Sequence, residues 1–251
     1  MQESEIIARD IAAEKYEQLE LKGKGYHHIR IQLNVILSNV KIKANDYVLD
    51  AGCGTGRITR PIAQRCGKVI AIDFSENSIK VLKEISESKS IKNIEIMRGD
   101  LTKDIPLENI DKAISVQVIQ HIPSEISRIE SVKNICNCLK DGGTFTMASY
   151  NYNIFMKNHG VLKEGFFPNG IYYIRYTPEE IKILFQKCGF EDIIVRGYNN
   201  FCWYYILGNS KFANLILYPV AIIDELISRF KFSAKTGQYL ICTGVKRSDS
   251  K

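Results

Sequence analysis

The sequence lacks any apolar run long enough to cross a membrane as a helix. Its longest such run, Leu215–Ile223, contains Pro219 and is followed at once by Asp224 and Glu225, whereas a spanning helix needs about 20 apolar residues. Blocks of five or more like charges are also missing, and the net charge is only +6. We therefore expect no stable membrane insertion, and the scattered charges favour a solvated surface over a basic patch for an anionic partner.

The seven cysteines do not show the spacing of a metal site. Cys136 and Cys138 are two residues apart on a predicted helix, which points them to different faces. The acidic, polar start of the chain, Met1–Glu5, does not resemble a secretory signal. These features predict free thiols in a reducing compartment, and hence a cytoplasmic protein without a bound metal.

Short runs rich in Val and Ile alternate with segments of helical periodicity. We expect strands at Tyr47–Ala51, Lys68–Asp73, Ile94–Arg98, Lys112–Gln117, Thr144–Tyr150, Asp192–Gly197 and Gln238–Lys246. Helices are expected at about 55–66, 75–89, 124–139 and 178–188, the last with a capping box that starts at Thr177. This alternation predicts an α/β fold with seven strands in a mainly parallel sheet and helices on both faces. Ligands of such folds bind outside the carboxyl ends of the strands.

Three stretches do not follow the alternation. Residues 1–40 are expected to form a helical cap, broken at Lys22–Tyr26, while 151–176 is rich in aromatic residues and glycine. A helical insertion is expected within 198–232. Long connections in compact domains are usually functional, so the predicted organisation is a cap (1–40), a cofactor-binding core (41–150), a lid insertion (151–176) and the C-terminal part of the core (177–251).

Three glycines, Gly52, Gly54 and Gly56, follow the first predicted strand in the stretch VLDAGCGTGRITR. Glycine permits positive φ and lets a ligand approach the backbone, and the helix that follows presents free N–H groups to an anion. The spacing is G-x-G-x-G, whereas enzymes that bind dinucleotides use G-x-G-x-x-G. A tight strand-to-helix turn without a ligand would use the same glycines.

Acidic residues stand at three successive strand ends beside this turn. Asp73 ends the second strand, where its carboxylate can accept both hydroxyls of a ribose, and Asp100 follows the third, where it can accept from the amine of an adenine. Asp50 precedes the glycines and can hold a cation or a helix N-terminus. A cationic ligand with a ribose and an adenine suits these acids better than a pyrophosphate does.

At this point the sequence resembles the class I S-adenosylmethionine-dependent methyltransferases. The matching stretches are VLDAGCGTG (Val48–Gly56), VIAIDFSENSI (Val69–Ile79), GDL (Gly99–Leu101), ISVQVIQHI (Ile114–Ile122) and LKDGGTF (Leu139–Phe145). The resemblance implies a Rossmann-like, doubly wound sheet with an antiparallel last strand and S-adenosylmethionine as cofactor.

The resemblance also implies which residues hold that cofactor. Gly52, Cys53, Gly54 and Gly56 would lie against its methionine and ribose, after Asp50, and Asp73 would bind the ribose hydroxyls. The adenine would lie by Asp100 and Leu101 and pack on Phe74. Gln117 and Val118 would line the methionine end, and Tyr16 or Tyr26 would close over the cofactor.

The segment after the fourth strand bears on the methyl acceptor. Relatives that methylate nucleic-acid bases or protein amides often have (Asp/Asn/Ser)-Pro-Pro-(Tyr/Phe) there, whereas this chain has VQVIQHIPS. We therefore expect transfer to an O or N atom of a small molecule in a biosynthetic pathway, with no nucleic-acid partner. Aromatic residues in 151–176 and 198–205 suit an apolar or aromatic acceptor, and equally suit the core of a lid.

Other interpretations stay open on the sequence. They are a methyltransferase for a lipid-linked or quinone-type acceptor, a non-catalytic cofactor-binding or scaffold protein of the same fold, and a nucleotide-dependent oxidoreductase, which the glycine spacing disfavours. The apolar helix expected near 212–230 is predicted to be buried; a homodimer face or a membrane-surface contact is the alternative.

Three residues are candidates for catalysis. His121 follows the fourth strand and can act as a general base near neutral pH, although a histidine there can equally bond a backbone carbonyl and set the turn before Pro123. His159 in the 151–176 stretch is a second histidine, for which a solvated loop position is the alternative. Tyr150 ends the fifth strand and can meet the acceptor or be a half-buried strand tyrosine.

Overall fold

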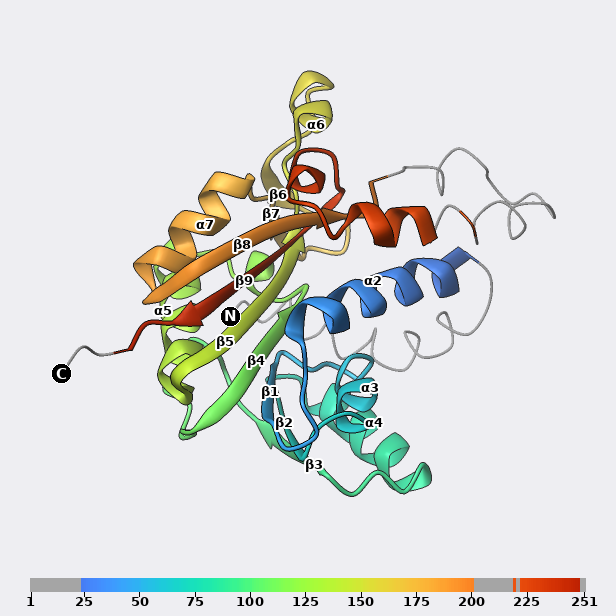
Figure 1. Ribbon diagram of the computed structural model, residues 1–251, viewed down its shortest axis with the longest axis vertical. Helices are drawn as coiled ribbons and strands as arrows, with labels where there is room; N and C mark the ends of the chain where they lie inside the picture. Colours follow the sequence, from blue (N-terminus) through green and yellow to red (C-terminus); the bar gives the residue numbers. More distant parts are fainter. Residues whose placement is uncertain (1–23, 201–218, 220–221, 249–251) are drawn as a thin grey trace.

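The computed structural model describes residues 24–200, 219 and 222–248, and the side chains of 24–31 lie outside the described part (Figure 1). Its centre is a seven-stranded sheet of order β3-β2-β1-β4-β5-β9-β8. The strands are β1 (Tyr47–Ala51), β2 (Lys68–Asp73), β3 (Ile94–Arg98), β4 (Ile110–Val116), β5 (Leu139–Tyr150), β8 (Phe190–Tyr198) and β9 (Tyr239–Lys246). The predicted bounds of β1, β2 and β3 are confirmed without change.

The sheet is parallel except for its last strand. β1 pairs in parallel with β2 and β4, and the same holds for the pairs β2–β3 and β4–β5. β9 lies between β5 and β8 and runs antiparallel to both. The expected Rossmann-like sheet, mainly parallel with an antiparallel last strand, is therefore confirmed, and the carboxyl ends of the parallel strands meet at one edge.

Helices cover both faces of the sheet because side chains alternate along each strand. Val48 packs on one face with Ile36 of α2 (Lys24–Val40), and α3 (Thr59–Ala63) lies on that face too. Leu49 packs on the opposite face with Ile135 of α5 (Glu125–Cys138) and Phe185 of α7 (Pro178–Lys187). α4 (Glu76–Ser88) lies near α3 in Figure 1.

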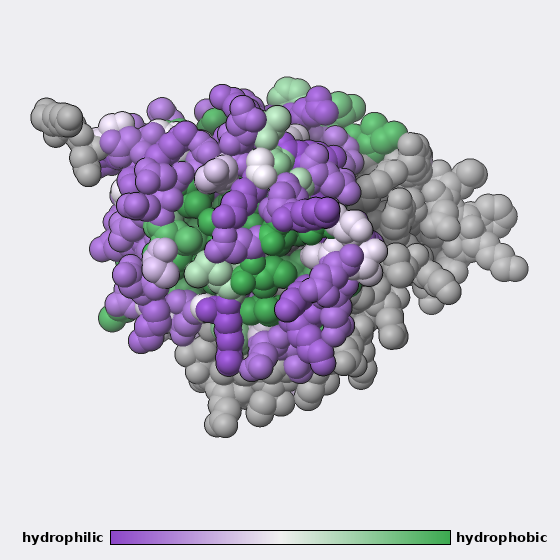
Figure 2. Space-filling model, turned by 90° about the horizontal axis from the view of Figure 1, so that it is seen from below, coloured by the Kyte–Doolittle hydropathy of each residue, from purple (hydrophilic) through white to green (hydrophobic). Residues whose placement is uncertain are grey.

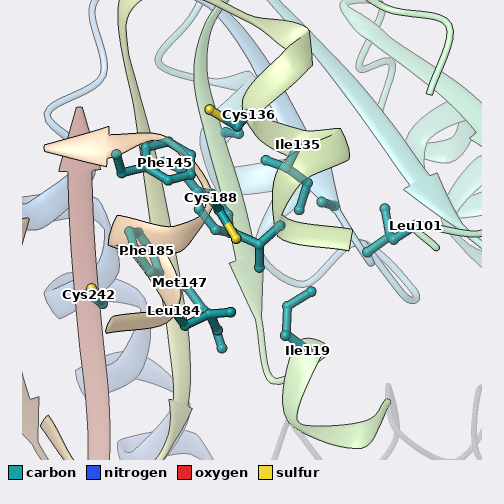
Figure 3. Packing of buried hydrophobic residues seen from close by; sticks show 14 of the residues in the cluster. Leu101, Ile119, Ile135, Cys136, Phe145, Met147, Leu184, Phe185, Cys188 and Cys242 are labelled. Carbon is teal, nitrogen blue, oxygen red and sulfur yellow. The ribbon is translucent and has the colours of Figure 1, made fainter. Parts of the chain in front are cut away.

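The centre of the α5–α7 side is aromatic. Phe145 of β5 is fully buried and stacks on Phe185 with ring centroids 5.2 Å apart, and its ring lies 5.6 Å from that of Phe190. Figure 3 shows Met147 and Leu184 continuing this packing between β5 and α7. Burial of this apolar surface holds α7 on the sheet.

Two expectations about helices differ from the structure. The helix expected at 55–66 is only Thr59–Ala63, because the glycine turn extends through Gly56 with φ 85°. The break expected over Lys22–Tyr26 is wrong in its second half, because α2 already begins at Lys24; residues 1–23 lie outside the described part. The capping box at Thr177 and the caps at Ser75 and Ser124 are present.

The stretch 151–176 contains small elements that its composition did not reveal. α6 (Ile154–Asn158) follows β5, and a separate two-stranded sheet pairs β6 (Glu164–Phe166) with β7 (Tyr172–Ile174). The hairpin is antiparallel and closes where the N–H of Gly170 donates to the carbonyl of Phe167. The division into cap, core and lid stays a prediction.

β3 and β8 are the edge strands of the sheet, and β3 lies at the bottom of Figure 1. Figure 2 shows the molecule from that side, where hydrophobic residues gather in the middle of the view, bordered by hydrophilic ones, and a few lie at its margins. Exposed Glu95 and Arg98 lie on β3, and such charges hinder pairing with another strand. None of the helices in the described ranges is long and apolar enough to cross a membrane.

Candidate active site

The glycine turn after β1 needs its glycines for different reasons. Gly52 has φ 86°, and a Cβ placed on it would collide with Val118, while a Cβ on Gly56 would collide with Leu82. Gly54 has φ 53°, and a Cβ on it would meet nothing within 4 Å. Gly52 and Gly56 therefore serve close packing, and Gly54 leaves bare backbone facing open space, as a bound ligand requires.

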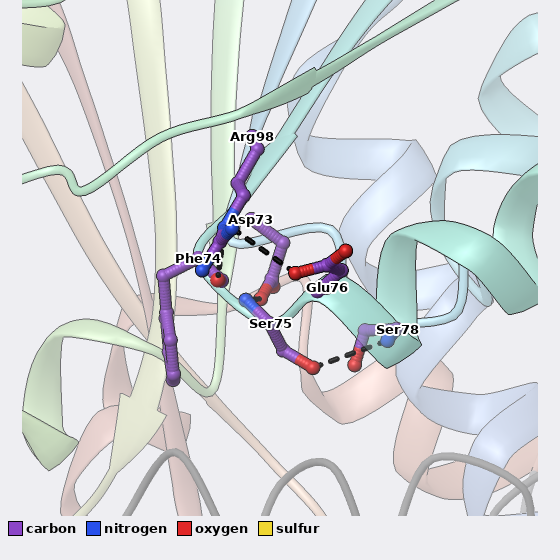
Figure 4. A network of polar contacts seen from close by, with 6 residues as sticks. All are labelled: Asp73, Phe74, Ser75, Glu76, Ser78 and Arg98. Atoms are coloured by element: carbon purple, nitrogen blue, oxygen red, sulfur yellow. Dashed lines mark hydrogen bonds and ion pairs between the residues drawn. The ribbon is translucent and has the colours of Figure 1, made fainter. Parts of the chain in front are cut away.

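The carboxylate of Asp73 joins this turn to the end of β2. Its Oδ2 accepts from the N–H of Gly54 at 2.8 Å, and its Oδ1 accepts from the N–H of Ser75 at 2.9 Å. Figure 4 shows Asp73 beside Ser75 and the start of α4, while the ring of Phe74 extends away from the exposed Arg98–Glu76 ion pair. Asp73 thus lies at the turn, where a ribose was expected.

Asp50 is buried just before the glycines. Its carboxylate accepts from the hydroxyl of Thr59 at 2.6 Å, so it holds the first residue of α3. Burial raises the pKa of Asp50 to about 6; the Thr59 hydrogen bond opposes this shift and the charge of Asp73 adds to it. Burial, with the charges of Asp50 and Asp73, also raises the pKa of the Cys53 thiol well above its usual range.

The predicted adenine residues lie after β3. One oxygen of Asp100 accepts from the N–H and the hydroxyl of Thr102, both at 2.9 Å, which fixes the loop. Leu101 is buried in the core beside α5, while Phe74 is half-buried. The position of these residues after adjacent strands agrees with one binding edge, and their contact with an adenine stays a prediction.

The residue that directly follows β4 has a strained backbone conformation. Gln117 has φ 60°, and non-glycine residues with such φ cost roughly 1 kcal/mol or more and cluster at functional sites. Its side chain accepts from the Gln120 amide, while Nε2 of Gln117 and Oε1 of Gln120 are buried without a partner in the described ranges. The two amides therefore place a buried polar pair at the end of β4.

His121 and Tyr150 lie together under the β6–β7 hairpin. Nδ1 of buried His121 is 2.7 Å from the carbonyl of Tyr172; since a carbonyl only accepts, Nδ1 carries the proton and the neutral ring has its basic lone pair on Nε2. The His121 and Tyr150 rings meet edge to face at 5.7 Å, and Phe167 lies 6.3 Å and 6.1 Å from them. The carbonyl contact expected for a structural role is therefore present, in a geometry that also suits a base.

The other candidates are not brought into this cluster by any described contact. His159 is exposed, stacks on Phe155 of its own helix with ring centroids 4.0 Å apart, and bonds the Phe155 carbonyl. Tyr16 lies outside the described residues, as does the side chain of Tyr26. Their proposed roles stay predictions.

A buried polar network was missed from the sequence. Arg57, just after the glycine turn, donates to Gln32 of α2 at 2.8 Å, and Gln32 donates to the hydroxyl of Tyr198 at 3.0 Å. Burial raises the pKa of Tyr198 to about 12. The side-chain amide of Gln117 lies beside the same Tyr198 hydroxyl. The network joins α2, β8 and the residue after the glycine turn. Local sequence patterns carry no signal for the Gln32–Tyr198 contact, which links residues 166 positions apart.

Comparison with known proteins identifies the family. Residues 42–187 match the family described as "Methyltransferase domain". The chain belongs to the class I S-adenosylmethionine-dependent methyltransferases. The match covers β1 to α7, and with it the glycine turn, Asp73, Asp100 and His121.

The relatives differ in what their names say they methylate. One is a probable ribosomal RNA small subunit methyltransferase A from Methanosphaera stadtmanae, 34% identical over 38% of this chain and 33% of its own length. Another is a ubiquinone biosynthesis O-methyltransferase from Pseudomonas entomophila, 26% identical over 85% of this chain and 95% of that one. This chain thus spans about a third of the first relative and nearly all of the second.

A solved structure shows the same fold. It is an S-adenosylmethionine-dependent methyltransferase from Thermotoga maritima, described as a possible histamine N-methyltransferase, with a TM-score of 0.63 and 17% identity. The similarity covers 96% of this chain and 98% of that one. In the described ranges, no three His, Cys, Asp or Glu side chains are grouped as metal ligands.

We predict that Gly52→Ala damages the turn more than Gly54→Ala does. The first change adds a collision with Val118 to the cost of positive φ, while the second adds only the cost of φ, about 1 kcal/mol. Denaturant titration should show the larger loss of unfolding free energy for Gly52→Ala and partial recovery in Gly52→Ala/Val118→Ala. Equal losses for both single variants would contradict this account.

We predict that Asp50→Asn changes how stability depends on pH. Because the folded state raises this pKa from 3.8 to about 6, it binds the proton more tightly than the unfolded chain, so ionisation of Asp50 lowers stability as pH rises from 4 to 6. The unfolding free energy of Asp50→Asn relative to the native chain should increase by up to about 3 kcal/mol between pH 4 and pH 7.

The matched control for this pH effect is Asp111→Asn, at the opposite edge of the sheet. Burial tends to raise the pKa of Asp111, but hydrogen bonds from Lys140 and the Tyr47 N–H outweigh it, so the net shift is downward. Its substitution should therefore change relative stability with pH in the opposite direction. A constant difference between Asp50→Asn and the native chain across this range would refute the Asp50 assignment.

Proposed function

We propose that the protein transfers the methyl group of S-adenosylmethionine to a hydroxyl oxygen on a small aromatic molecule. The observation that carries the proposal is the arrangement at the ends of β4 and β5: a buried histidine with its basic nitrogen defined, next to aromatic rings and an incompletely bonded glutamine pair. These groups supply a base, flat apolar walls and a polar anchor.

The glycine turn and the strand ends suit the methyl donor. Open space at Gly54 and the carboxylate of Asp73 are adjacent, as contact with a ribose beside bare backbone requires. In this assignment Asp73 binds the ribose, Asp100 and Phe74 hold the adenine, and Gln117 and Val118 lie at the methionine end. The donor supplies an activated methyl group, so the chain needs to align the acceptor, exclude water and remove its proton.

His121 is the proposed base. The contact of its Nδ1 with the carbonyl of Tyr172 orients the ring, and in this proposal Nε2 takes the proton of the acceptor hydroxyl. Tyr150 and Phe167 contact this ring and would hold a flat acceptor beside it. The amide groups of Gln117 and Gln120 match a hydroxyl, which can both donate and accept.

Coverage of the relatives supports a small molecule over nucleic acid. The O-methyltransferase relative aligns along 85% of this chain, including the acceptor side, whereas the ribosomal RNA relative aligns along 38%. The six cysteines of the described ranges are buried and form no disulfide with one another, which fits the predicted cytoplasmic location. A quinone-type acceptor falls within the proposed class.

Calorimetric titration with S-adenosylhomocysteine and with NAD tests the donor site. We expect micromolar binding of the sulfur compound, no binding of NAD, and at least about tenfold weaker binding by Asp73→Asn, since a charged hydrogen bond contributes roughly 1.5–3 kcal/mol. Glu95→Gln, in an exposed pair with Lys68 on the amino side of the sheet, is the control and should bind normally. NAD binding without the sulfur compound would instead support an oxidoreductase.

Steady-state kinetics with a catechol as acceptor test the other side of the site. His121→Asn keeps a donor near the Tyr172 carbonyl but lacks the basic nitrogen, so kcat should fall about 100-fold or more while donor affinity is kept. Gln120→Leu should chiefly raise KM for the acceptor. Native kcat in His121→Asn would make that residue structural, and absence of turnover with normal donor binding across hydroxylated aromatics would favour a scaffold.

A further inference from the structure

In the helical residues 222–227 the usual burial pattern of a surface helix is reversed, with a charged side chain buried and apolar side chains exposed. Their buried side chain is Asp224, 2% exposed, while Ile222, Ile223 and Leu226 face outward. The Asp224 carboxylate accepts from the backbone N–H groups of Asn199 and Asn200 at 2.7 and 2.6 Å. This polar anchoring to the end of β8 fixes which face of the helix is outward, and that face is apolar.

The apolar surface continues into the following turn. Phe230 and Phe232 stack on each other with ring centroids 5.7 Å apart and stay exposed on one side. Together with the three helical residues they are between 45% and 58% exposed. Single exposed apolar residues are normal, but five large ones within eleven positions mark an interaction surface.

The exposed charge in this segment is basic. Arg229, Lys231 and Lys235 are exposed, the last two on the short helix η2 (Lys231–Lys235). Of the two acids, Asp224 is buried and Glu225 is bonded to Asn34 and paired with Arg229. The surface of residues 222–235, called here the 222–235 patch, therefore combines apolar side chains with a net positive charge.

The patch lies at the edge of the sheet that carries the site. Asp224 binds residues just after β8, and Asn153, the N-cap of α6, donates to the carbonyls of Thr236 and Gly237 at 3.3 and 3.1 Å. Figure 1 shows α6, η2 and the helical residues 222–227 near one another at this end of the molecule. A surface bound to the patch would thus lie at the edge of the sheet where β5 and β8 end.

We propose that the 222–235 patch docks the protein on the surface of an anionic membrane. Aromatic and aliphatic side chains beside lysines and arginines are the chemistry of interfacial binding, in which apolar groups enter the headgroup region and cations meet anionic lipids. If a second copy of this chain bound here, two positively charged patches would face and repel each other. If nucleic acid bound here, the exposed apolar side chains would have no apolar surface to pack against. The charge of the patch therefore favours the membrane.

Sedimentation of the full chain with vesicles tests this proposal. Vesicles of phosphatidylcholine with 30% phosphatidylglycerol should bind the protein, vesicles of phosphatidylcholine alone should bind it much less, and rising salt should weaken binding. Phe230→Ser/Phe232→Ser should reduce binding about tenfold or more. Lys231→Gln/Lys235→Gln should also reduce it, roughly fivefold for each charge removed.

The matched control is Ile126→Ser/Ile183→Ser, which removes exposed apolar side chains from α5 and α7, on the opposite side of the sheet from α2. This variant should bind vesicles like the native chain. All variants should unfold at the same midpoint temperature as the native chain. The proposal is overturned if the native chain ignores anionic vesicles, if it binds both kinds equally, or if the control loses as much. It is also overturned if light scattering shows a dimer that the phenylalanine variant abolishes, since the patch would then join two copies.

Discussion

The carboxylate of Asp73 is the contact on which the binding edge depends. It accepts one hydrogen bond from the glycine turn after β1 and one from the turn after β2, so a single side chain fixes both loops relative to each other. The neighbouring N–H groups of Gly52 and Cys53 donate to the carbonyl of Ile72, the residue before Asp73. β1 and β2 thus continue to act as one unit beyond their last paired residues, which keeps the bare backbone at Gly54 in place.

Sequence reasoning reached the parts of the fold that local patterns determine. β1 and β2 are mostly buried runs rich in apolar residues, whereas β3 combines half-buried Ile94 and Ile96 with exposed Glu95 and Arg98. Turn residues bound all three strands, and their ends were predicted at the right positions. The glycine turn and Asp73 were recognisable because backbone conformation and ligand chemistry both restrict the residue types allowed there. His121 was placed at the correct edge for the same reason: it directly follows a strand whose pattern is clear.

Contacts between distant segments could not be predicted in this way. The β6–β7 hairpin has three-residue strands, and it is held by the bond between His121 and the Tyr172 carbonyl and by the Tyr172 hydroxyl bonded to Glu164. The strain at Gln117 is likewise invisible in sequence, because its positive φ reflects the connection from β4 to the residues before α5. The arrangement around His121 and Tyr150 depends mainly on such contacts, so it could be described only from the structure.

The high pKa of Cys53 has a consequence for a protein that handles an electrophile. Its sulfur lies within the glycine turn, where its thiol donates to the carbonyl of Gly54 at 3.6 Å. Burial disfavours a thiolate there, and the nearby carboxylates of Asp50 and Asp73 add to this effect. A protonated thiol is a poor nucleophile compared with its anion. A protonated Cys53 is therefore slow to react with electrophiles and with oxidants, which suits a family whose methyl donor is itself an electrophile.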